Sequence, residues 1–225
     1  MENCQCLQER DLQLKQIKAI IFDLDGVICS TDQYHYLAWK KLADRLGIYF
    51  DERVNQKLRG VSRMESLEII LGERSGEFSE MEKRALAEEK NHIYREYLSS
   101  MTPDDLSEET RMTLETLRSR GYLLGIGSSS KNTKQILSQL GLGDFFDAIA
   151  DGTQITYSKP DPEVFLLAAE KLGVEPEEAL VIEDADSGIQ AAYAGAFRAI
   201  GIRTPENQPD SEISIKRLAN LLDIL

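Results

Sequence analysis

The sequence contains little cysteine, no long apolar run and fewer basic than acidic residues. Its three cysteines, Cys4, Cys6 and Cys29, are an odd and small number for 225 residues, which argues against a disulfide-stabilised scaffold. Cys4 and Cys6 are spaced like part of a metal motif, but no second cysteine or histidine pair completes it. No stretch approaches about 18 consecutive apolar residues, so we expect no transmembrane helix. The first sixteen residues lack the apolar segment of a signal peptide, and we expect a cytoplasmic protein.

The charge balance excludes two classes of partner. Lysine and arginine number 26 against 39 aspartate and glutamate, a formal net charge of -13 at pH 7. A nucleic-acid surface needs a basic stripe, and docking on anionic membranes needs basic clusters, so we expect neither partner. The acidity favours solubility. An anionic substrate would have to be attracted locally, by a bound metal, Lys, Arg and backbone N–H groups.

Two acidic residues follow directly on an apolar stretch near the N-terminus. Residues 17–22 read IKAIIF and predict a buried strand, and residues 23–27 read DLDGV. Strand alternation places Asp23 and Asp25 on one side, at the strand end where parallel α/β sheets bind ligands. Two carboxylates this close repel and need a cation, a proton or a tight turn, for which Gly26 gives backbone freedom. An ordinary polar turn after a strand would show the same pattern.

Three further motifs follow in order along the chain. Together with the acidic pair at 23 and 25, they resemble the four motifs of the haloacid dehalogenase superfamily of phosphotransferases. Each motif alone is weak, whereas the ordered set at plausible strand ends is specific. The motifs are Ser128 after a predicted strand at 122–127, Lys159 in the loop 157–162, and Glu183 with Asp184 after a predicted strand at 179–182.

The resemblance implies catalysis through a covalent phosphate ester. Asp23 is the implied nucleophile that forms an aspartyl phosphate, and Asp25 is the implied general acid and base. Asp23 could instead be only a metal ligand, and Asp25 only a cap on the turn. Ser128 and Lys159 would stabilise the transferring phosphoryl group. Hard oxygen ligands select Mg²⁺, and we expect one ion per chain. Its expected ligands are Asp23, the backbone carbonyl of Asp25, Glu183 and Asp184.

The other motif residues also have structural interpretations that the sequence leaves open. Lys159 could be a solvated loop charge. Ser128 could cap the following helix, where Ser130 competes for the same role. The acidic pair 183–184 could simply begin a helix predicted near residue 187, because negative charge is favourable at a helix N-terminus.

Apolar periodicity divides the chain into a helical segment and a strand–helix segment. Between about 33 and 100 only helical spacing occurs, which indicates an inserted helical domain. Beyond it strands and helices alternate, as in a parallel sheet covered on both faces. The predicted strands are 17–22, 122–127, 148–150, 179–182 and 198–202, and the predicted helices are 34–46, 51–58, 63–71, 79–99, 107–120, 132–140, 161–172, 187–194 and 213–225.

This pattern predicts an α/β fold with a Rossmann-like doubly wound parallel sheet core and an inserted four-helix (all-α) cap domain. We expect an N-terminal extension over 1–16, a core formed by 17–31 plus 101–225, and a cap over 32–100. The linkers near 31–33 and 97–103 are the expected hinges of the cap.

Four segments are similar to one family within the superfamily. They read TDQYHYLAWK at 31–40, LRGVSRMESL at 58–67, SSSKN at 128–132 and FDAIAD at 146–151. Together they resemble the β-phosphoglucomutase family over about residues 17–203. The family commonly has lysine where this chain has Arg59, and the two side chains are not equivalent, which leaves the preferred sugar open.

The resemblance implies a set of substrate contacts in the cap and in the serine loop. His35 would help to position the acid–base residue, and Arg63 would hold the phosphate that is not reacting, because guanidinium binds phosphate bidentately. A surface histidine and an exposed helix charge are the structural alternatives. Trp39 could instead belong to the core, and Lys90 could be a solvated charge. The implied binding residues are Trp39, Arg59, Gly60, Val61, Ser62, Arg63, Ser66, Lys90, Ser130, Lys131 and Asn132.

The resemblance implies a mutase that interconverts β-D-glucose 1-phosphate and D-glucose 6-phosphate. The reaction would pass through an aspartyl-phosphate enzyme and a bound β-glucose 1,6-bisphosphate, with the cap excluding water. A capped phosphatase for sugar phosphates or phosphoglycolate shares the core motifs and is the alternative. A non-catalytic binding protein on this fold would be suggested by loss of Asp23 or Asp25, and both are present. We expect a monomer with a small sugar phosphate as its partner.

Overall fold

The computed structural model describes residues 16–58, 62–204 and 208–225. Most of the predicted N-terminal extension, including Cys4 and Cys6, therefore lies outside the described residues, as do Arg59, Gly60 and Val61. The chain forms two compact units. One runs up to Ser30 and resumes over Thr102–Leu225, and the other is Thr31–Met101.

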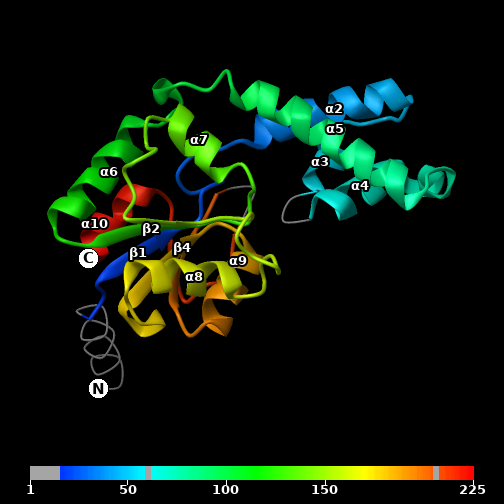
Figure 1. Ribbon diagram of the computed structural model, residues 1–225. Coiled ribbons are helices and arrows are strands. Elements are labelled where there is room, and N and C mark those ends of the chain that lie inside the picture. The colour runs from blue at the N-terminus through cyan, green and yellow to red at the C-terminus, as the bar shows by residue number, and fades with distance from the viewer. Residues whose placement is uncertain (1–15, 59–61, 205–207) are drawn as a thin grey trace. The chain divides into compact units, whose positions relative to one another are not determined.

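A parallel sheet forms the centre of the larger unit (Figure 1). In the described residues its six strands are ordered β3-β2-β1-β4-β5-β6, and all pairs are parallel. This is the doubly wound order, in which ligands bind where the order reverses, beyond the carboxyl ends of the central strands. That point lies between β1 and β4. The strands are β1 Ala19–Phe22, β2 Leu123–Gly127, β3 Ala148–Ala150, β4 Ala179–Glu183, β5 Arg198–Ile202 and β6 Ile213–Ile215.

Helices cover both faces of this sheet. In Figure 1, α8 and α9 lie on one face, and α6, α7 and α10 lie on the other. The residues of β1 and β4 are all buried, as expected for strands covered on both sides. Ile21, Val181, Phe165 and Ile189 belong to one buried cluster that joins β1 and β4 to α8 and α9. The helices are α6 Glu108–Ser119, α7 Thr133–Gln139, α8 Glu163–Leu172, α9 Asp186–Ala194 and α10 Leu221–Ile224.

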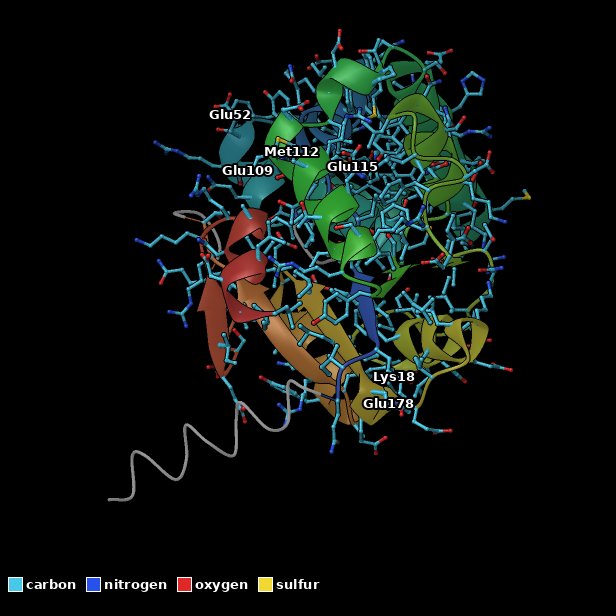
Figure 2. The ribbon with its side chains drawn as sticks, turned by 90° about the vertical axis from the view of Figure 1, so that its left-hand side faces the viewer. Lys18, Glu52, Glu109, Met112, Glu115 and Glu178 are labelled. Carbon is cyan, nitrogen blue, oxygen red and sulfur yellow. The ribbon has the colours of Figure 1, made fainter. Side chains whose placement is uncertain are left out.

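The register of the central strands aligns the ends that carry the acidic residues. Lys18 donates its backbone N–H to the Glu178 carbonyl at 2.8 Å, and their side chains form an ion pair at the start of β1 (Figure 2). Phe22 at the end of β1 then lies opposite Ile182. Asp23 and Glu183, the next residues, therefore leave the sheet at the same level.

In its described residues, the regular structure of the smaller unit is helical. Its cluster of buried side chains includes Trp39, Leu42 and Leu67. The N-termini of two of its helices carry capping boxes, at Ser62 and Ser79, which satisfy the first backbone donors. The predicted fold class, a doubly wound parallel sheet with a helical insertion, is confirmed. The helices are α2 Asp32–Leu46, α3 Glu52–Gln56, α4 Arg63–Leu71 and α5 Glu80–Leu98.

The prediction of a helical tail over 213–225 is wrong in its first part. Ile213–Ile215 forms β6, which pairs with β5 through Ile200 and Ile213, and only Leu221–Ile224 is α-helical. The reason is the apolar–polar–apolar alternation of Ile213–Ile215, which has the period of a strand and finds a partner at the edge of β5. No helix in the described part of the chain is long and apolar enough to cross a bilayer.

Candidate active site

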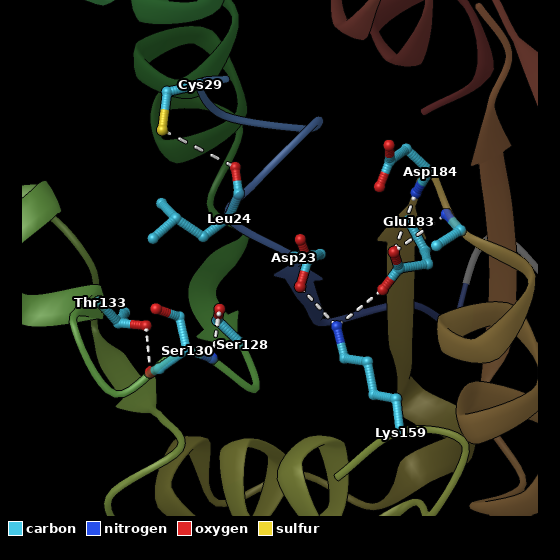
Figure 3. Close-up of polar contacts among 10 residues, drawn as sticks. Asp23, Leu24, Cys29, Ser128, Ser130, Thr133, Lys159, Glu183 and Asp184 are labelled. Atoms are coloured by element: carbon cyan, nitrogen blue, oxygen red, sulfur yellow. Dashed lines mark hydrogen bonds and ion pairs between the residues drawn. The ribbon is translucent and has the colours of Figure 1, made fainter. Parts of the chain in front are cut away.

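Two buried carboxylates and one lysine meet beyond the ends of β1 and β4 (Figure 3). Asp23 and Glu183 are only 8% and 2% exposed. The Lys159 ammonium donates to Asp23 Oδ1 at 2.5 Å and to Glu183 Oε2 at 2.7 Å. It also lies 4.5 Å from the centroid of the Phe165 ring, so its surroundings are apolar on one side. The interpretation of Lys159 as a solvated loop charge is therefore wrong.

Burial decides the ionisation of this cluster. It raises the pKa of Asp23 to about 7, with Lys159 opposing the shift and Glu183 adding to it. Burial likewise raises the pKa of Glu183, and Lys159 again opposes it. For Lys159, burial alone would lower the pKa, but Asp23 and Glu183 outweigh it and hold the pKa above its ordinary value. The lysine is therefore charged, and its ammonium favours the ionised form of both carboxylates.

The acidic side chains of this cluster suit a divalent cation. Asp23, Glu183 and Asp184 each offer a carboxylate oxygen, and these oxygens lie within 4.8 Å of one another. When all three carboxylates are ionised, they outnumber the single ammonium of Lys159 and leave an excess of negative charge. A hard dication prefers such oxygen ligands and would neutralise that excess. The donor set therefore fits a Mg²⁺ site.

The two oxygens of the Glu183 carboxylate have different partners. Its Oε1 accepts the backbone N–H groups of Asp184 and Ala185, both at 3.1 Å, just before α9 begins at Asp186. Its Oε2 accepts from Lys159. The carboxylate thus shapes the entry to the helix with one oxygen and faces the lysine with the other. Gly188 makes room for it, because a Cβ there would lie 2.0 Å from the carboxylate.

The loop after β1 brings Asp25 and Gly26 next to these groups. The backbone of Asp25 hydrogen-bonds the Asp23 carboxylate and lowers its pKa somewhat, and the Asp25 side chain is half-buried. Gly26 has a φ of 88°, in the left-handed region that favours glycine. A Cβ on Gly26 would lie 2.2 Å from Asp184 Oδ2, so this glycine lets the first acidic loop approach the second.

We expect Gly26→Ala to impair metal-dependent activity beyond its backbone strain. The left-handed conformation alone costs about 1–2 kcal/mol for a residue with a Cβ, and displacement of Asp184 adds to that. Gly47→Ala is the matched control, because Gly47 has a φ of 65° and open space around its Cβ position. Both variants should unfold at lower temperature, but only Gly26→Ala should raise the Mg²⁺ concentration for half-maximal activity, by about tenfold or more. An equal Mg²⁺ requirement in the two variants would contradict the role of Gly26.

The serine loop after β2 is ordered by its own hydroxyl groups. Ser128 is buried and donates its backbone N–H to the Ala150 carbonyl at 3.1 Å. Ser128 Oγ accepts the N–H of Ser130, and Ser130 Oγ accepts the N–H of Asn132, both at 3.2 Å. These contacts use hydroxyl lone pairs and leave the O–H protons as donors. The loop thus presents hydroxyl donors suited to an anion.

Neither serine caps the helix that follows. The helix α7 begins at Thr133, and Asn132 stands at its N-cap without a side-chain capping bond. The interpretations of Ser128 and Ser130 as N-caps are therefore wrong. Lys131 and Asn132 lie on the same short loop as the two hydroxyl groups, directly before α7. The Lys131 side chain is exposed and that of Asn132 is buried.

A polar cluster inside the helical unit contains His35 and Lys90. Lys90 is only 2% exposed, and its Nζ lies 2.8 Å from His35 Nδ1 and within 5 Å of the ring centroids of Trp39 and Tyr94. An ammonium can only donate, so Nδ1 accepts, and the neutral ring carries its proton on Nε2. Burial, Lys90 and Arg63 lower the pKa of His35 well below its ordinary value. The interpretations of Lys90 as a solvated charge and His35 as a plain surface histidine are wrong.

The remaining predicted binding residues of this unit have mixed surroundings. Trp39 belongs to the apolar core, as its structural alternative proposed, although one face meets the Lys90 ammonium. Ser62 caps α4 by accepting the Glu65 N–H at 3.3 Å, and Ser66 is buried within that helix. Arg63 is partly exposed at the start of α4.

Several residues that shape these clusters were not singled out by sequence reasoning. Gly188 had a usable signal, because a glycine in the first turn of a helix that follows an acidic pair indicates close approach. Phe165 and Tyr94 had none, since each is one apolar position among many in an amphipathic helix. Tyr94 donates its hydroxyl to Thr31 Oγ1 at 2.9 Å, which fixes α5 to the start of the helical unit.

Comparisons with known proteins agree with this fold. Residues 17–195 match the haloacid dehalogenase-like hydrolase family, and the chain belongs to that family. The chain is 39% identical to the β-phosphoglucomutase of Bacillus subtilis (strain 168), over 91% of this chain and 92% of that protein. A β-phosphoglucomutase structure from Clostridium difficile has a TM-score of 0.82 at 40% identity, covering 91% and 93% of the two chains. The resemblance to the β-phosphoglucomutase family is therefore confirmed.

Other relatives are hydrolases. The fructose-1-phosphate phosphatase of Escherichia coli (strain K12) is 33% identical over 82% of this chain and 95% of that protein. The chain is thus an enzyme of a family whose members include both mutases and phosphatases.

Proposed function

We propose that this enzyme is a Mg²⁺-dependent β-phosphoglucomutase that interconverts β-D-glucose 1-phosphate and D-glucose 6-phosphate. The observation that carries the proposal is the buried Asp23 carboxylate, bridged to Glu183 by Lys159 at the switch point of the sheet. The chain is 39–40% identical to two β-phosphoglucomutases over 91% of its length. This identity supports the mutase reaction over other phosphoryl-transfer reactions.

Asp23 is the proposed nucleophile. Its carboxylate oxygen attacks phosphorus, the bond from phosphorus to the sugar oxygen breaks, and an aspartyl phosphate forms. Asp25 protonates the departing sugar oxygen and takes the proton back from the hydroxyl that attacks in the reverse direction. Lys159 and the Ser128 hydroxyl stabilise the oxygens of the transferring group. When bound, Mg²⁺ held by Asp23, Glu183, Asp184 and the Asp25 carbonyl neutralises phosphoryl charge.

The mutase cycle transfers the phosphoryl group twice. Phosphorylated Asp23 gives its group to the 6-hydroxyl of β-glucose 1-phosphate, while Asp25 accepts the hydroxyl proton. The resulting β-glucose 1,6-bisphosphate reverses its orientation, and its 1-phosphate returns to Asp23. Asp25 then protonates the sugar O1, and glucose 6-phosphate leaves.

A mutase needs a second anion site for the phosphate that is not reacting, and Arg63 is the proposed centre of it. Arg63 is the first residue of α4, where the helix dipole disfavours a cation. Such a local conflict is expected at functional positions. The Ser130 hydroxyl, Lys131 and Asn132 supply further donors for this phosphate. We propose that His35 positions Asp25, with its neutral ring donating from Nε2.

A phosphatase for sugar phosphates is the second candidate, favoured by the relative that is a fructose-1-phosphate phosphatase. A coupled assay with β-glucose 1-phosphate and catalytic glucose 1,6-bisphosphate tests the choice. We expect more glucose 6-phosphate than inorganic phosphate to form. Net release of inorganic phosphate without glucose 6-phosphate would contradict the proposed mutase activity.

We expect Arg63→Ala to reduce mutase turnover at least about a hundredfold while changing hydrolysis of an aryl phosphate less than threefold. The reason is that the only phosphate of the aryl substrate is the reacting one, so it places no phosphate at Arg63, and a bidentate guanidinium–phosphate contact is strong when partly buried. Parallel steady-state assays with β-glucose 1-phosphate and p-nitrophenyl phosphate measure both effects. Equal losses on both substrates would remove Arg63 from the second anion site.

A further inference from the structure

Arg63 has a carboxylate partner within its own unit. Arg63 Nη1 lies 3.4 Å from Glu88 Oε2, with the two side chains 30% and 73% exposed. Glu88 Oε1 also accepts from Asn91 Nδ2 at 3.3 Å. A single long contact to an exposed carboxylate is weak, because solvent screens it and the side chain is free to move away.

The surroundings of Arg63 favour an anion at this position. The guanidinium stands at the N-terminus of α4, next to the positive end of the helix dipole. Burial lowers the pKa of Arg63, and Glu88 partly offsets that shift, so an adjacent anion stabilises the charged form. The reciprocal capping box of Ser62 and Glu65 engages two of the backbone donors of this helix end, the N–H groups of Ser62 and Glu65. The guanidinium is the charged donor that an anion meets at this helix end.

We propose that Glu88 is a displaceable counter-ion of Arg63 that sets the affinity of the enzyme for substrates that place a non-reacting phosphate at Arg63. This inference rests on the proposed role of Arg63 in the mutase. A carboxylate and a phosphate both pair with the guanidinium fork, so Glu88 competes with the phosphate that is not reacting. A dianionic phosphate with bidentate geometry displaces the single long carboxylate contact.

Glu88 thereby acts as a filter between substrates. A sugar phosphate or bisphosphate that reaches Arg63 must displace the Glu88 carboxylate. Only a dianionic phosphate binds the guanidinium strongly enough to do so. A compound that offers only the reacting phosphate never competes with Glu88. Glu88 therefore lowers the affinity of the Arg63 site for every anion that binds there. It does so least for the anions with the highest negative charge, which are thereby favoured.

Glu88→Gln tests the inference in the full-length, Mg²⁺-loaded enzyme. We expect the KM for β-glucose 1-phosphate to fall about two- to fivefold, the range of an exposed ion pair, with kcat within twofold of wild type. The KM for p-nitrophenyl phosphate should not change. Glu89→Gln is the matched control, because it removes the same charge one residue away on α5, where Glu89 pairs with Arg45 at 2.7 Å.

Epistasis distinguishes competition at Arg63 from a general effect of charge. In an Arg63→Ala background, Glu88→Gln should leave the KM for β-glucose 1-phosphate unchanged. An unchanged KM in the single variant, or an equal fall in Glu88→Gln and Glu89→Gln, would overturn the inference. Failure of the mutase proposal looks different, since wild-type enzyme would then release inorganic phosphate without forming glucose 6-phosphate.

Discussion

Asp23→Asn is expected to lower kcat by about ten-thousandfold or more, the scale seen when a covalent nucleophile is removed. The amide keeps the volume of the carboxylate and an oxygen that can accept from Lys159, but it is a poor nucleophile toward phosphorus. Both glucose 6-phosphate formation and p-nitrophenyl phosphate hydrolysis should fall together, because both pass through the same ester. Wild-type enzyme should become labelled from phosphorylated substrate, and the variant should not.

The stability of this variant separates lost chemistry from lost folding. Burial raises the pKa of Asp23 to about 7, against about 4 in the unfolded chain. The folded protein therefore holds the Asp23 proton between these values, and the contribution of Asp23 to the stability of metal-free wild type declines as the pH rises from about 4 to 7. Asparagine does not titrate, so metal-free Asp23→Asn should lose less stability over that interval in thermal unfolding scans.

Asp144→Asn is a suitable control, because Asp144 is an exposed carboxylate of the same unit. It should retain wild-type activity. If Asp23→Asn retained more than about one-hundredth of the activity, Asp23 would be a ligand or an electrostatic partner, and the covalent mechanism would have to be given up.

The core of the site could be predicted because it depends on the ends of strands. In a parallel sheet the residues that follow neighbouring strands share one edge, so the apolar runs before Asp23, Ser128 and Glu183 were enough to place them. The register of β1 with β4 then brings Asp23 level with Glu183. The lysine loop was predicted only from the order of the motifs, since loop conformation has no comparable period.

What could not be predicted depends on packing between elements. The burial of Lys90 against Trp39 and Tyr94 is not encoded by the charged surroundings of Lys90 in the sequence. The contact between Arg63 on α4 and Glu88 on α5 joins residues that are 25 positions apart in the sequence. The short strand Ile213–Ile215 was overlooked because three residues give too little alternation to compete with the helical pattern that follows them.

Lys159→Met is expected to destabilise the metal-free protein by about 3–5 kcal/mol at pH 8, because it leaves two buried carboxylates without their ammonium. For a chain of this size that corresponds to a fall in Tm of roughly 10 °C. Methionine keeps most of the side-chain volume over Phe165, so lost packing contributes little. Turnover should fall about a hundredfold or more, because the phosphoryl oxygens lose a positive charge.

The loss of stability should depend on pH, with a sign fixed by the carboxylates. The attraction of Lys159 is available only while Asp23 and Glu183 are ionised, and burial raises the pKa of both. Removing the lysine raises these pKa values further, so the folded variant binds still more protons and loses stability faster as the pH rises. The difference from wild type should therefore be small at pH 5 and large at pH 8, as measured by chemical unfolding at the two values.

A double variant and a surface control isolate the buried ion pair. Lys159→Met combined with Asp23→Asn should recover much of the stability lost in Lys159→Met at pH 8, because one of the two uncompensated charges is removed with the lysine. Lys134→Met, which replaces an exposed lysine on α7, should change Tm by no more than about 1–2 °C. A double variant no more stable than Lys159→Met would mean that the lysine supports the fold through packing, and the electrostatic account of this cluster would be wrong.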